Sequence, residues 1–289
     1  MKALPNLDAS LDGDALNAAY NPVAYVGPTV FAQRMAAYRD ASDRALATLP
    51  VQAGLCYDPA SGQCLDLFPA GPGTPLVVYI HGGYWRALSR AESRFPALGL
   101  VPAGISFATL DYALAPDTSL VEITRQCRAA LAYLWHNAQA LGIDRNRMIV
   151  TGSSAGGHLA AMLMVAGWQA DFGLPEDALA GGVPISGLFD LSPIARSFVQ
   201  AWLGLAPADI AALSPLSYPL AQGCRAILAW GSDEPSGFAT QSRALQQVWR
   251  NARLMELPDR DHFDAALDLT DPDSPLFKAL VSLIPVRTA

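Results

Sequence analysis

Two glycines flank a serine at the point where an apolar run of the sequence gives way to a predicted helix. The segment GSSAG at residues 152–156 has the spacing G-x-S-x-G, which is typical of a serine held on a sharp turn between a strand and a helix. The glycines let the strand and the helix pass close to each other, and a helix N-terminus favours negative charge beside the serine. We therefore predict that Ser154 is a nucleophile for acyl transfer. Ser153 is out of register with the glycines, and a turn of small residues without chemistry is the alternative.

A second motif of small residues, HGGYW at residues 81–85, follows another apolar run. An acyl-transfer enzyme needs two backbone N–H donors aimed at the oxyanion of its intermediate. We expect one donor from Ala155, the residue after the nucleophile, and the other from the loop of Gly82, Gly83 and Tyr84. Glycine suits such a loop because no Cβ blocks the approach of the backbone to the substrate. A plain turn after a strand is the alternative.

His262 is the histidine best placed to act as the general base for Ser154, because it stands in a polar loop after the last apolar run. The other three histidines have simpler interpretations. His81 belongs to the oxyanion loop and braces it. His136 lies in an amphipathic helical stretch, and His158 follows the serine on a helix that turns it away.

The third member of the site should orient the imidazole and stabilise its charged form. A serine on a turn of this kind is followed along the chain by the acid and then by the histidine. Asp233 comes directly after the apolar run 224–231 and is the predicted acid, with Glu234 as the fallback and Asp190 as a weaker alternative. This mechanism requires no organic cofactor, and no metal is expected, because no His or Cys repeats at ligand spacing.

The elements that would position these residues alternate between apolar runs and helical stretches. The apolar runs are near-continuous, as in parallel strands buried on both faces, and they occupy residues 75–81, 104–112, 147–151, 180–186, 224–231 and 254–257. Helical stretches lie between them at residues 120–141, 157–168 and 240–251, and a hairpin pattern precedes them at 51–57 and 64–68. The alternation predicts an α/β protein with a mostly parallel sheet flanked by helices and a site at the carboxyl ends of the strands.

We predict a single domain over residues 1–289, because no linker, repeat or low-complexity tract divides the chain. Residues 1 to about 50 contain amphipathic helices, interrupted at Asn21-Pro22 and Gly27-Pro28. We expect this part to form a short helical lid over a core of residues from about 51 to 289.

Composition favours a folded protein and argues against nucleic-acid binding. Hydrophobic residues make up 52% of the chain, and the formal net charge is −7, without a long run of Lys or Arg. The longest apolar stretch, residues 159–168, is too short to span a bilayer, and the N-terminus has no apolar signal core. We expect a cytoplasmic protein that does not bind membranes. Its four cysteines are expected to be free thiols, with a Cys56–Cys64 disulfide as the alternative.

Taken together, these motifs resemble those of the kynurenine formamidases (arylformamidases), a branch of the α/β-hydrolases related to the hormone-sensitive-lipase esterases. HGGYW is similar to the oxyanion motif of that family, and its Tyr-Trp is more discriminating than its glycines. The other matching segments occur in the same order as in the family. They are YNP at 20–22, GSSAGGHLA at 152–160, ISGLFDLSPI at 185–194, GSDEPSGFATQS at 231–242 and DHFDAALDL at 261–269. The resemblance covers roughly residues 18 to 280. It implies the α/β-hydrolase fold, a triad of Ser154, Asp233 and His262, and a homodimer.

The same resemblance implies that the substrate is a small molecule, an aryl formamide such as N-formylkynurenine, cleaved through an acyl-enzyme. A carboxylesterase acting on small aryl or acyl esters is the alternative. A lipase acting at membranes and a non-catalytic binding protein on the same fold are more remote alternatives.

An aryl substrate needs an apolar pocket, which aromatic side chains near the motifs would line. We expect Tyr84 there, together with Trp85, Phe198, Trp202, Phe238 and Phe263. The N-terminal aromatic residues either cover the pocket as part of the lid or pack in the core, and they are Tyr20, Tyr25 and Phe31. Arg86 or Arg196 would meet a substrate carboxylate, and an ordinary surface position is the alternative for both.

Overall fold

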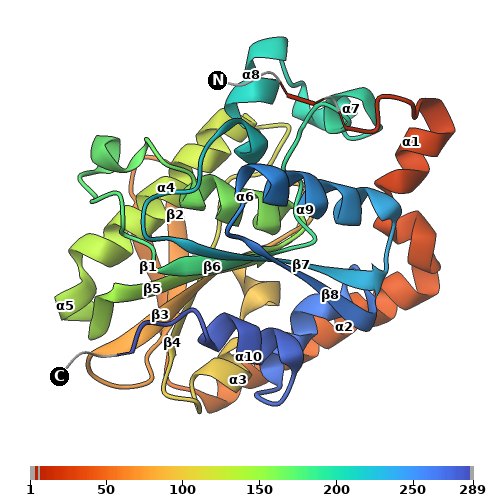
Figure 1. The fold of residues 1–289 in the computed structure, drawn as a ribbon. Coiled ribbons are helices and arrows are strands. Elements are labelled where there is room, and N and C mark those ends of the chain that lie inside the picture. The colour runs from red at the N-terminus through yellow and green to blue at the C-terminus, as the bar shows by residue number, and fades with distance from the viewer. Residues whose placement is uncertain (1–3, 6, 287–289) are drawn as a thin grey trace.

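The apolar runs of the sequence pair into one twisted sheet (Figure 1). The computed structural model describes residues 4–5 and 7–286, and in these residues eight strands follow the spatial order β1-β2-β4-β3-β5-β6-β7-β8. β1 pairs antiparallel with β2, and β2 with β4, whereas all other neighbours are parallel. The strands are β1 (Gln52–Asp58), β2 (Gln63–Phe68), β3 (Thr74–Ile80), β4 (Ser106–Leu110), β5 (Ile143–Ser153), β6 (Gly181–Ile185), β7 (Arg225–Asp233) and β8 (Arg253–Asp261). The predicted mostly parallel sheet is confirmed.

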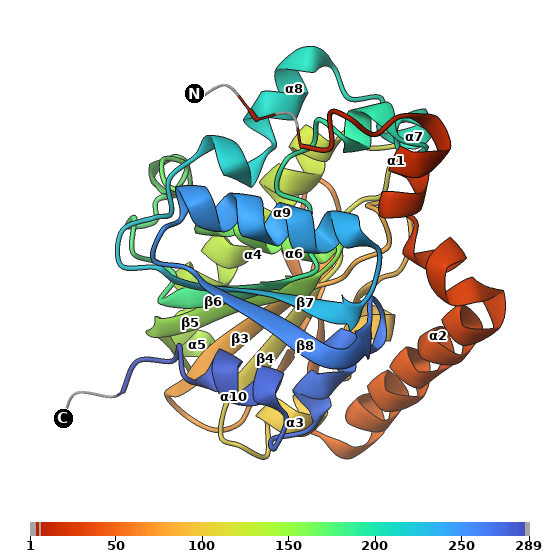
Figure 2. The same ribbon diagram turned by 45° about the vertical axis from the view of Figure 1, so that its right-hand side comes forward.

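Helices cover both faces of the sheet (Figure 2). One face packs against α4 (Leu120–His136), α6 (Ala155–Met164) and α9 (Ser236–Val248), and the other against α2 (Pro22–Thr48), α3 (Ala97–Leu100) and α10 (Pro275–Val281). Strand β3 shows why both faces are apolar, since its alternate side chains enter the two cores in turn. Leu76, Val78 and Ile80 join the first core, while Val77 and Tyr79 join the second.

Shorter helices occupy the connections. They are α1 (Gly13–Ala19), α5 (Ala138–Leu141), α7 (Gln200–Leu203) and α8 (Pro207–Ala212), with the 3-10 turns η1 (Arg90–Ser93), η2 (Gln169–Phe172), η3 (Ile194–Arg196), η4 (Pro215–Ser217) and η5 (Asp264–Thr270). The predicted helices agree with the observed ones in kind and differ at their ends. Predicted helix 240–251 begins earlier, at Ser236, and predicted helix 157–168 is α6, which ends at Met164.

Helix α2 is fastened to the loop that follows β8. It kinks at Gly27, where the backbone is not helical, and then runs past the loop. The guanidinium of Arg34 forms ion pairs with Asp261 at 2.9 Å and with Asp264 at 2.8 Å. The Tyr38 hydroxyl donates to the Phe263 carbonyl at 2.6 Å. Each contact joins the N-terminal part of the chain, where the lid is expected, to the loop after β8.

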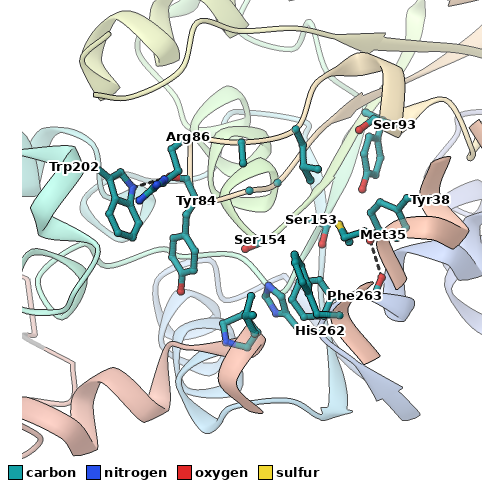
Figure 3. A pocket seen from close by; sticks show the side chains of 18 residues that line it. Met35, Tyr38, Tyr84, Arg86, Ser93, Ser153, Ser154, Trp202, His262 and Phe263 are labelled. Atoms are coloured by element: carbon teal, nitrogen blue, oxygen red, sulfur yellow. Dashed lines mark hydrogen bonds between the residues drawn. The ribbon is translucent and has the colours of Figure 1, made fainter. Parts of the chain in front are cut away.

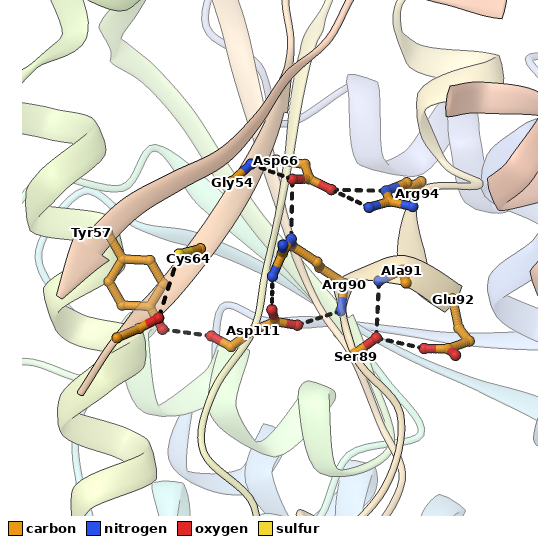
Figure 4. A network of polar contacts seen from close by, with 11 residues as sticks. Gly54, Tyr57, Cys64, Asp66, Ser89, Arg90, Ala91, Glu92, Arg94 and Asp111 are labelled. Atoms are coloured by element: carbon orange, nitrogen blue, oxygen red, sulfur yellow. Dashed lines mark hydrogen bonds and ion pairs between the residues drawn. The ribbon is translucent and has the colours of Figure 1, made fainter. Parts of the chain in front are cut away.

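A buried carboxylate holds the segment after the HGGYW loop against the sheet (Figure 4). Asp66 on β2 is fully buried and accepts hydrogen bonds from the backbone N–H of Gly54 at 2.8 Å and from Arg90 at 3.1 Å. It also forms an ion pair with Arg94 at 2.7 Å, and Arg90 contacts Asp111 as well. Because a buried charge without partners would be costly, this cluster fixes η1 relative to β2 and β4.

Cys56 and Cys64 lie directly opposite each other on β1 and β2. All four cysteines are free thiols, as expected.

Within residues 4–5 and 7–286, no helix is both long and apolar enough to cross a membrane.

Candidate active site

Ser154 stands between β5 and α6 in a backbone conformation that few residues adopt. Its φ of 60° and ψ of −120° lie in a sparsely populated region that costs roughly 1–3 kcal/mol. Backbone contacts hold it there: its N–H donates to the Ile185 carbonyl at 2.8 Å, and its carbonyl accepts from the His158 N–H at 3.0 Å. The serine therefore sits at the tip of a tight turn with the N-terminus of α6 behind it.

The flanking glycines are required by close backbone contacts. A Cβ at Gly156 would lie 2.0 Å from the carbonyl oxygen of Ile80, and one at Gly152 would lie 2.5 Å from that of Gly156. Real Cβ atoms do not approach backbone this closely, so any side chain here would push α6 away from β3. The G-x-S-x-G spacing thus has the steric cause that the sequence suggests.

His262 lies in the loop after β8, where a buried carboxylate holds its ring. Its Nδ1 is 2.6 Å from Oε2 of Glu234, and the two residues are 2% and 8% exposed. An ionised carboxylate only accepts hydrogen bonds, so Nδ1 carries the proton and Nε2 is left to accept one. The ring of Phe238 packs against the imidazole at 4.2 Å between centroids and shields the pair from water.

The second oxygen of Glu234 is also occupied. Oε1 accepts a hydrogen bond from the Ser186 hydroxyl at 3.0 Å and another from the Gly231 N–H at 3.0 Å. These two donors stabilise the ionised carboxylate and fix its rotation. The imidazole is therefore held in one orientation from behind.

The prediction that Asp233 orients His262 is wrong. Asp233 is the last residue of β7, where successive side chains point to opposite sides. Its exposed carboxylate accepts a hydrogen bond from the Tyr25 hydroxyl at 3.2 Å, and it is the fallback residue Glu234 that contacts His262.

Asp190, the weaker alternative, is also engaged elsewhere. Its carboxylate accepts hydrogen bonds from the backbone N–H groups of Leu7 at 3.1 Å and Ser192 at 2.8 Å. It therefore anchors the N-terminal segment and does not contact His262.

The HGGYW loop lies directly against the serine. A Cβ at Gly82 would be 2.8 Å from the Ser153 carbonyl oxygen and 3.4 Å from the Ser154 Cβ, and one at Gly83 would be 2.3 Å from the Ala87 carbonyl oxygen. Gly83 also has a φ of 91°, which favours glycine. The loop can thus bring backbone N–H groups close to Ser154 only because both residues lack a side chain.

The expected second donor, Ala155, is the first residue of α6 and is fully buried. The first N–H groups of a helix have no partner within the helix. The Ala155 N–H therefore has no partner within α6, and it directly follows Ser154 in the chain.

His81 braces this loop, as its position in the motif suggested. Its ring stacks on Tyr112 at 4.0 Å between centroids, and the Tyr112 hydroxyl donates to the carbonyls of His81 at 3.0 Å and Gly82 at 3.1 Å. Burial lowers the pKa of His81 to about 4. The ring is therefore neutral at physiological pH and serves packing.

His158 has a similar structural role on α6. Its Nε2 lies 2.7 Å from the Leu213 carbonyl, and its ring meets that of Trp85 edge-on at 5.1 Å. Burial lowers its pKa to about 4. Neither of these two buried histidines competes with His262 as a base.

Acid is expected to destabilise the protein through these two residues. Their pKa values in the folded state, about 4, lie below the ordinary value of 6.5. The unfolded chain therefore binds more protons between these values, and the stabilisation is complete above pH 6.5 and is lost as the pH falls towards 4. Lowering the pH from 7.5 to 5 should cost roughly 2 kcal/mol of unfolding free energy per histidine.

Urea unfolding at the two pH values would measure this loss in the wild type and in His158→Gln. The substitution should make the pH dependence about 2 kcal/mol smaller. His136→Gln is the matched control, because His136 is exposed. An unchanged pH dependence in His158→Gln would contradict the assignment.

Ser154 and His262 line a pocket of about 290 Å³ (Figure 3). The glycine loop and Tyr84 form one side of it, and helix α2 forms another. Two of the five other aromatic residues expected to line it, Trp202 and Phe263, do so. The side chains that α2 contributes are Pro22, Val23, Phe31, Met35 and Tyr38.

The other three aromatic residues expected in the pocket lie behind its wall. Trp85 is fully buried and meets the ring of Tyr84 edge-on at 6.1 Å between centroids. Phe238 packs behind the ring of His262, and Phe198 supports Tyr84 edge-on at 5.9 Å. Each backs a lining residue instead of facing the pocket, so the prediction that they line it is wrong.

The three N-terminal aromatic residues lie in the pocket, in the core and on the surface. Phe31 lines the pocket. Tyr20 is fully buried and donates to Asp8 at 2.7 Å, whereas Tyr25 is exposed. Met35 and Tyr38 were missed, and the signal that would have found them is that they follow Phe31 at the helical spacings of four and seven residues.

The two arginines considered for a carboxylate also differ. Arg196 donates to the backbone carbonyls of Leu7, Asp8 and Leu11 and holds the N-terminal segment. Arg86 lines the pocket, with its guanidinium 4.4 Å from the ring centroid of Trp202.

Comparison with known proteins places this site in a family. The BD-FAE family model matches residues 68–248, more than half of the chain. The chain belongs to the BD-FAE family. Its relatives include the kynurenine formamidase of Danio rerio, 27% identical over 95% of this chain and 97% of the relative, and that of Salmo salar, 26% identical over 88% and 89%.

Solved structures give the same fold for this BD-FAE protein. A candidate thioesterase from Silicibacter sp. TM1040 is 28% identical, with a TM-score of 0.81 over 93% of this chain and 100% of that one. An esterase from Pyrobaculum calidifontis is 18% identical, with a TM-score of 0.70 over 89% and 92%. The chain is thus a hydrolase of ester- or amide-like bonds, in the kynurenine formamidase-like branch of the α/β-hydrolases.

Proposed function

We propose that this protein cleaves aryl formamides, such as N-formylkynurenine, through a triad of Ser154, His262 and Glu234. The observation that carries the proposal is the buried contact of 2.6 Å between His262 and Glu234, because His262 lines the same pocket as Ser154. A fixed imidazole with a free Nε2 beside a strained serine is the arrangement that nucleophilic acyl transfer needs.

The chemistry follows from these positions. Nε2 of His262 takes the proton of Ser154 as the serine oxygen attacks the formyl carbon. The Ala155 N–H and the glycine loop stabilise the oxyanion, and Glu234 stabilises the imidazolium. His262 then protonates the leaving amine, and water repeats the cycle on the formyl-enzyme to release formate.

Two observations support a formamide as the substrate. Two relatives that match most of the chain are named kynurenine formamidases. The pocket also offers aromatic side chains that suit a flat aryl group, namely Phe31, Tyr38, Tyr84, Trp202 and Phe263. Aromatic pairs of this kind add about 0.5–1.5 kcal/mol to the burial of apolar area.

The decisive test compares kcat/KM for N-formylkynurenine with kcat/KM for p-nitrophenyl acetate and butyrate, with Ser154→Ala as the blank. We expect the formamide to be preferred by at least about 100-fold, which is about 2.7 kcal/mol of transition-state stabilisation. If the esters are preferred and the formamide is barely hydrolysed, the proposed triad is retained and the proposed formamide substrate is rejected.

A carboxylesterase is the second candidate for the same site. The relatives also include the esterase LipQ of Mycobacterium tuberculosis, 26% identical over 70% of this chain and 53% of that protein, and the pocket lining is mainly apolar. The same substrate comparison decides between the two, because the triad serves both reactions.

A further inference from the structure

The residues that line the pocket carry one unbalanced cation. Among these described residues Arg86 is the single Lys or Arg, and none is Asp or Glu. The protein as a whole is acidic, with a formal net charge of −7, and Arg86 is a cation at the exposed edge of a mainly apolar pocket.

Arg86 has no carboxylate partner among the residues that the structure describes. In the part of the chain that the structure describes, its guanidinium forms no ion pair and donates no hydrogen bond, whereas other arginines beside internal sites do both. Arg34 and Arg94, for example, each pair with a carboxylate at 2.9 Å or less. The five N–H donors of Arg86 are therefore available to a ligand.

The guanidinium is nevertheless held in place. It lies 4.4 Å from the ring centroid of Trp202, and the Trp202 indole N–H donates to the Tyr84 carbonyl at 3.1 Å. Tyr84 belongs to the glycine loop beside Ser154, so the cation is linked to the loop that receives the substrate carbonyl. A guanidinium stacked in this way keeps its edge free for a planar anion.

The position of Arg86 suits one part of the substrate. In Figure 3, Arg86, Trp202 and Tyr84 lie on one side of Ser154, and Met35, Tyr38 and Phe263 lie on the other. Arg86 is also exposed, so it stands at the open side of the pocket. A polar group of a bound substrate would face this side while an apolar ring occupies the other.

We infer that Arg86 is a specificity residue that binds a carboxylate of the substrate, so the pocket selects aryl compounds that carry an anionic group. The inference rests on the proposed function for the position of the scissile bond, and it narrows the substrate class to anionic aryl formamides or esters. The carboxylate would meet the guanidinium in a charge-assisted, bidentate contact.

Binding measurements test this inference without any turnover. Isothermal titration calorimetry of the full-length protein would give Kd for 4-phenylbutyrate and for its neutral isostere 4-phenylbutyramide. We expect the wild type to bind the carboxylate about tenfold more tightly than the amide, which is about 1.4 kcal/mol. Arg86→Gln should bind both equally, because the charge-assisted hydrogen bonds to the carboxylate are lost.

Arg243→Gln is the matched control. Arg243 on α9 also lies over a tryptophan ring, 5.2 Å from the centroid of Trp230, and it does not line the pocket. This variant should keep the tenfold preference, which separates the position of Arg86 from a general loss of one positive charge.

Three results would overturn the inference: a wild type that does not prefer the carboxylate by several-fold, a preference that survives in Arg86→Gln or is lost in Arg243→Gln, or no binding of the carboxylate at millimolar concentration. Because these readouts do not involve hydrolysis, they are independent of the proposed reaction. A wild type that prefers the carboxylate but does not hydrolyse N-formylkynurenine would refute the formamidase proposal and leave the role of Arg86 standing.

Discussion

Glu234→Gln is expected to lower kcat/KM by about 10³- to 10⁴-fold, as the loss of the triad acid does in serine proteases. The reason lies in the two donors at Oε1, from Ser186 and Gly231. They require an acceptor, so the glutamine oxygen must face them and its amide N–H₂ must face His262. Nδ1 then has to accept, and the proton moves to Nε2, which can no longer take the proton of Ser154.

Asp233→Asn is the matched control for this experiment. Asp233 is adjacent in sequence, but it contacts Tyr25 and not His262, so kcat/KM should stay within about threefold, as for surface changes outside the triad. Steady-state kinetics on the preferred substrate, with circular dichroism to check folding, would measure both. A large loss in Asp233→Asn together with a near-normal Glu234→Gln would reverse our assignment.

Ser154→Ala is expected to lower kcat/KM by at least about 10⁴-fold, because the reaction loses its nucleophile and only binding and oxyanion stabilisation remain. A fluorophosphonate probe reports the same residue directly, since it labels only an activated serine. The wild type should be labelled and Ser154→Ala should not.

Ser153→Ala separates the two neighbouring serines. Ser153 also lines the pocket and is 5% exposed, so it shares the surroundings of Ser154 without its position on the turn. We expect Ser153→Ala to keep its labelling and most of its activity. Labelling that persists in Ser154→Ala and disappears in Ser153→Ala would identify Ser153 as the nucleophile, and an unlabelled wild type would favour a binding protein.

The serine turn and the glycine loop were predictable because their causes are local. Gly152 and Gly156 stand where two backbones cross, and only that crossing demands glycine on both sides of a serine. The strands were predictable for the same kind of reason, since parallel strands buried on both faces need continuous apolar runs.

The choice between Asp233 and Glu234 depended on something that no local pattern contains. Both are acids at the end of the same strand, and one residue of difference turns a side chain to the opposite side. The direction is decided by how β7 ends relative to β6 and the loop after β8. That is a property of the assembled sheet.

The residues that form the pocket wall could not be predicted from the sequence, because their position also depends on the assembled fold. Phe31 and Met35 lie more than 100 residues from Ser154 along the chain, and their place beside it follows from the packing of α2 against the second face of the sheet. Trp85 and Phe238 are aromatic and close to the motifs, yet nearness in sequence does not decide which side of a loop a ring occupies.

The fastening of α2 has a consequence for how substrate arrives and leaves. The helix that walls the pocket is tied by Arg34 and Tyr38 to the loop that carries His262. An outward movement of α2 would therefore also move the loop of His262 away from Ser154, and the triad would be disrupted. The exposed lining residues are Val23 on α2 and Arg86 and Ala87 in the loop after Tyr84, so the pocket is open where these residues lie. We therefore expect substrate and product to exchange through this opening while α2 stays in contact with the loop of His262, so the triad remains assembled between turnovers.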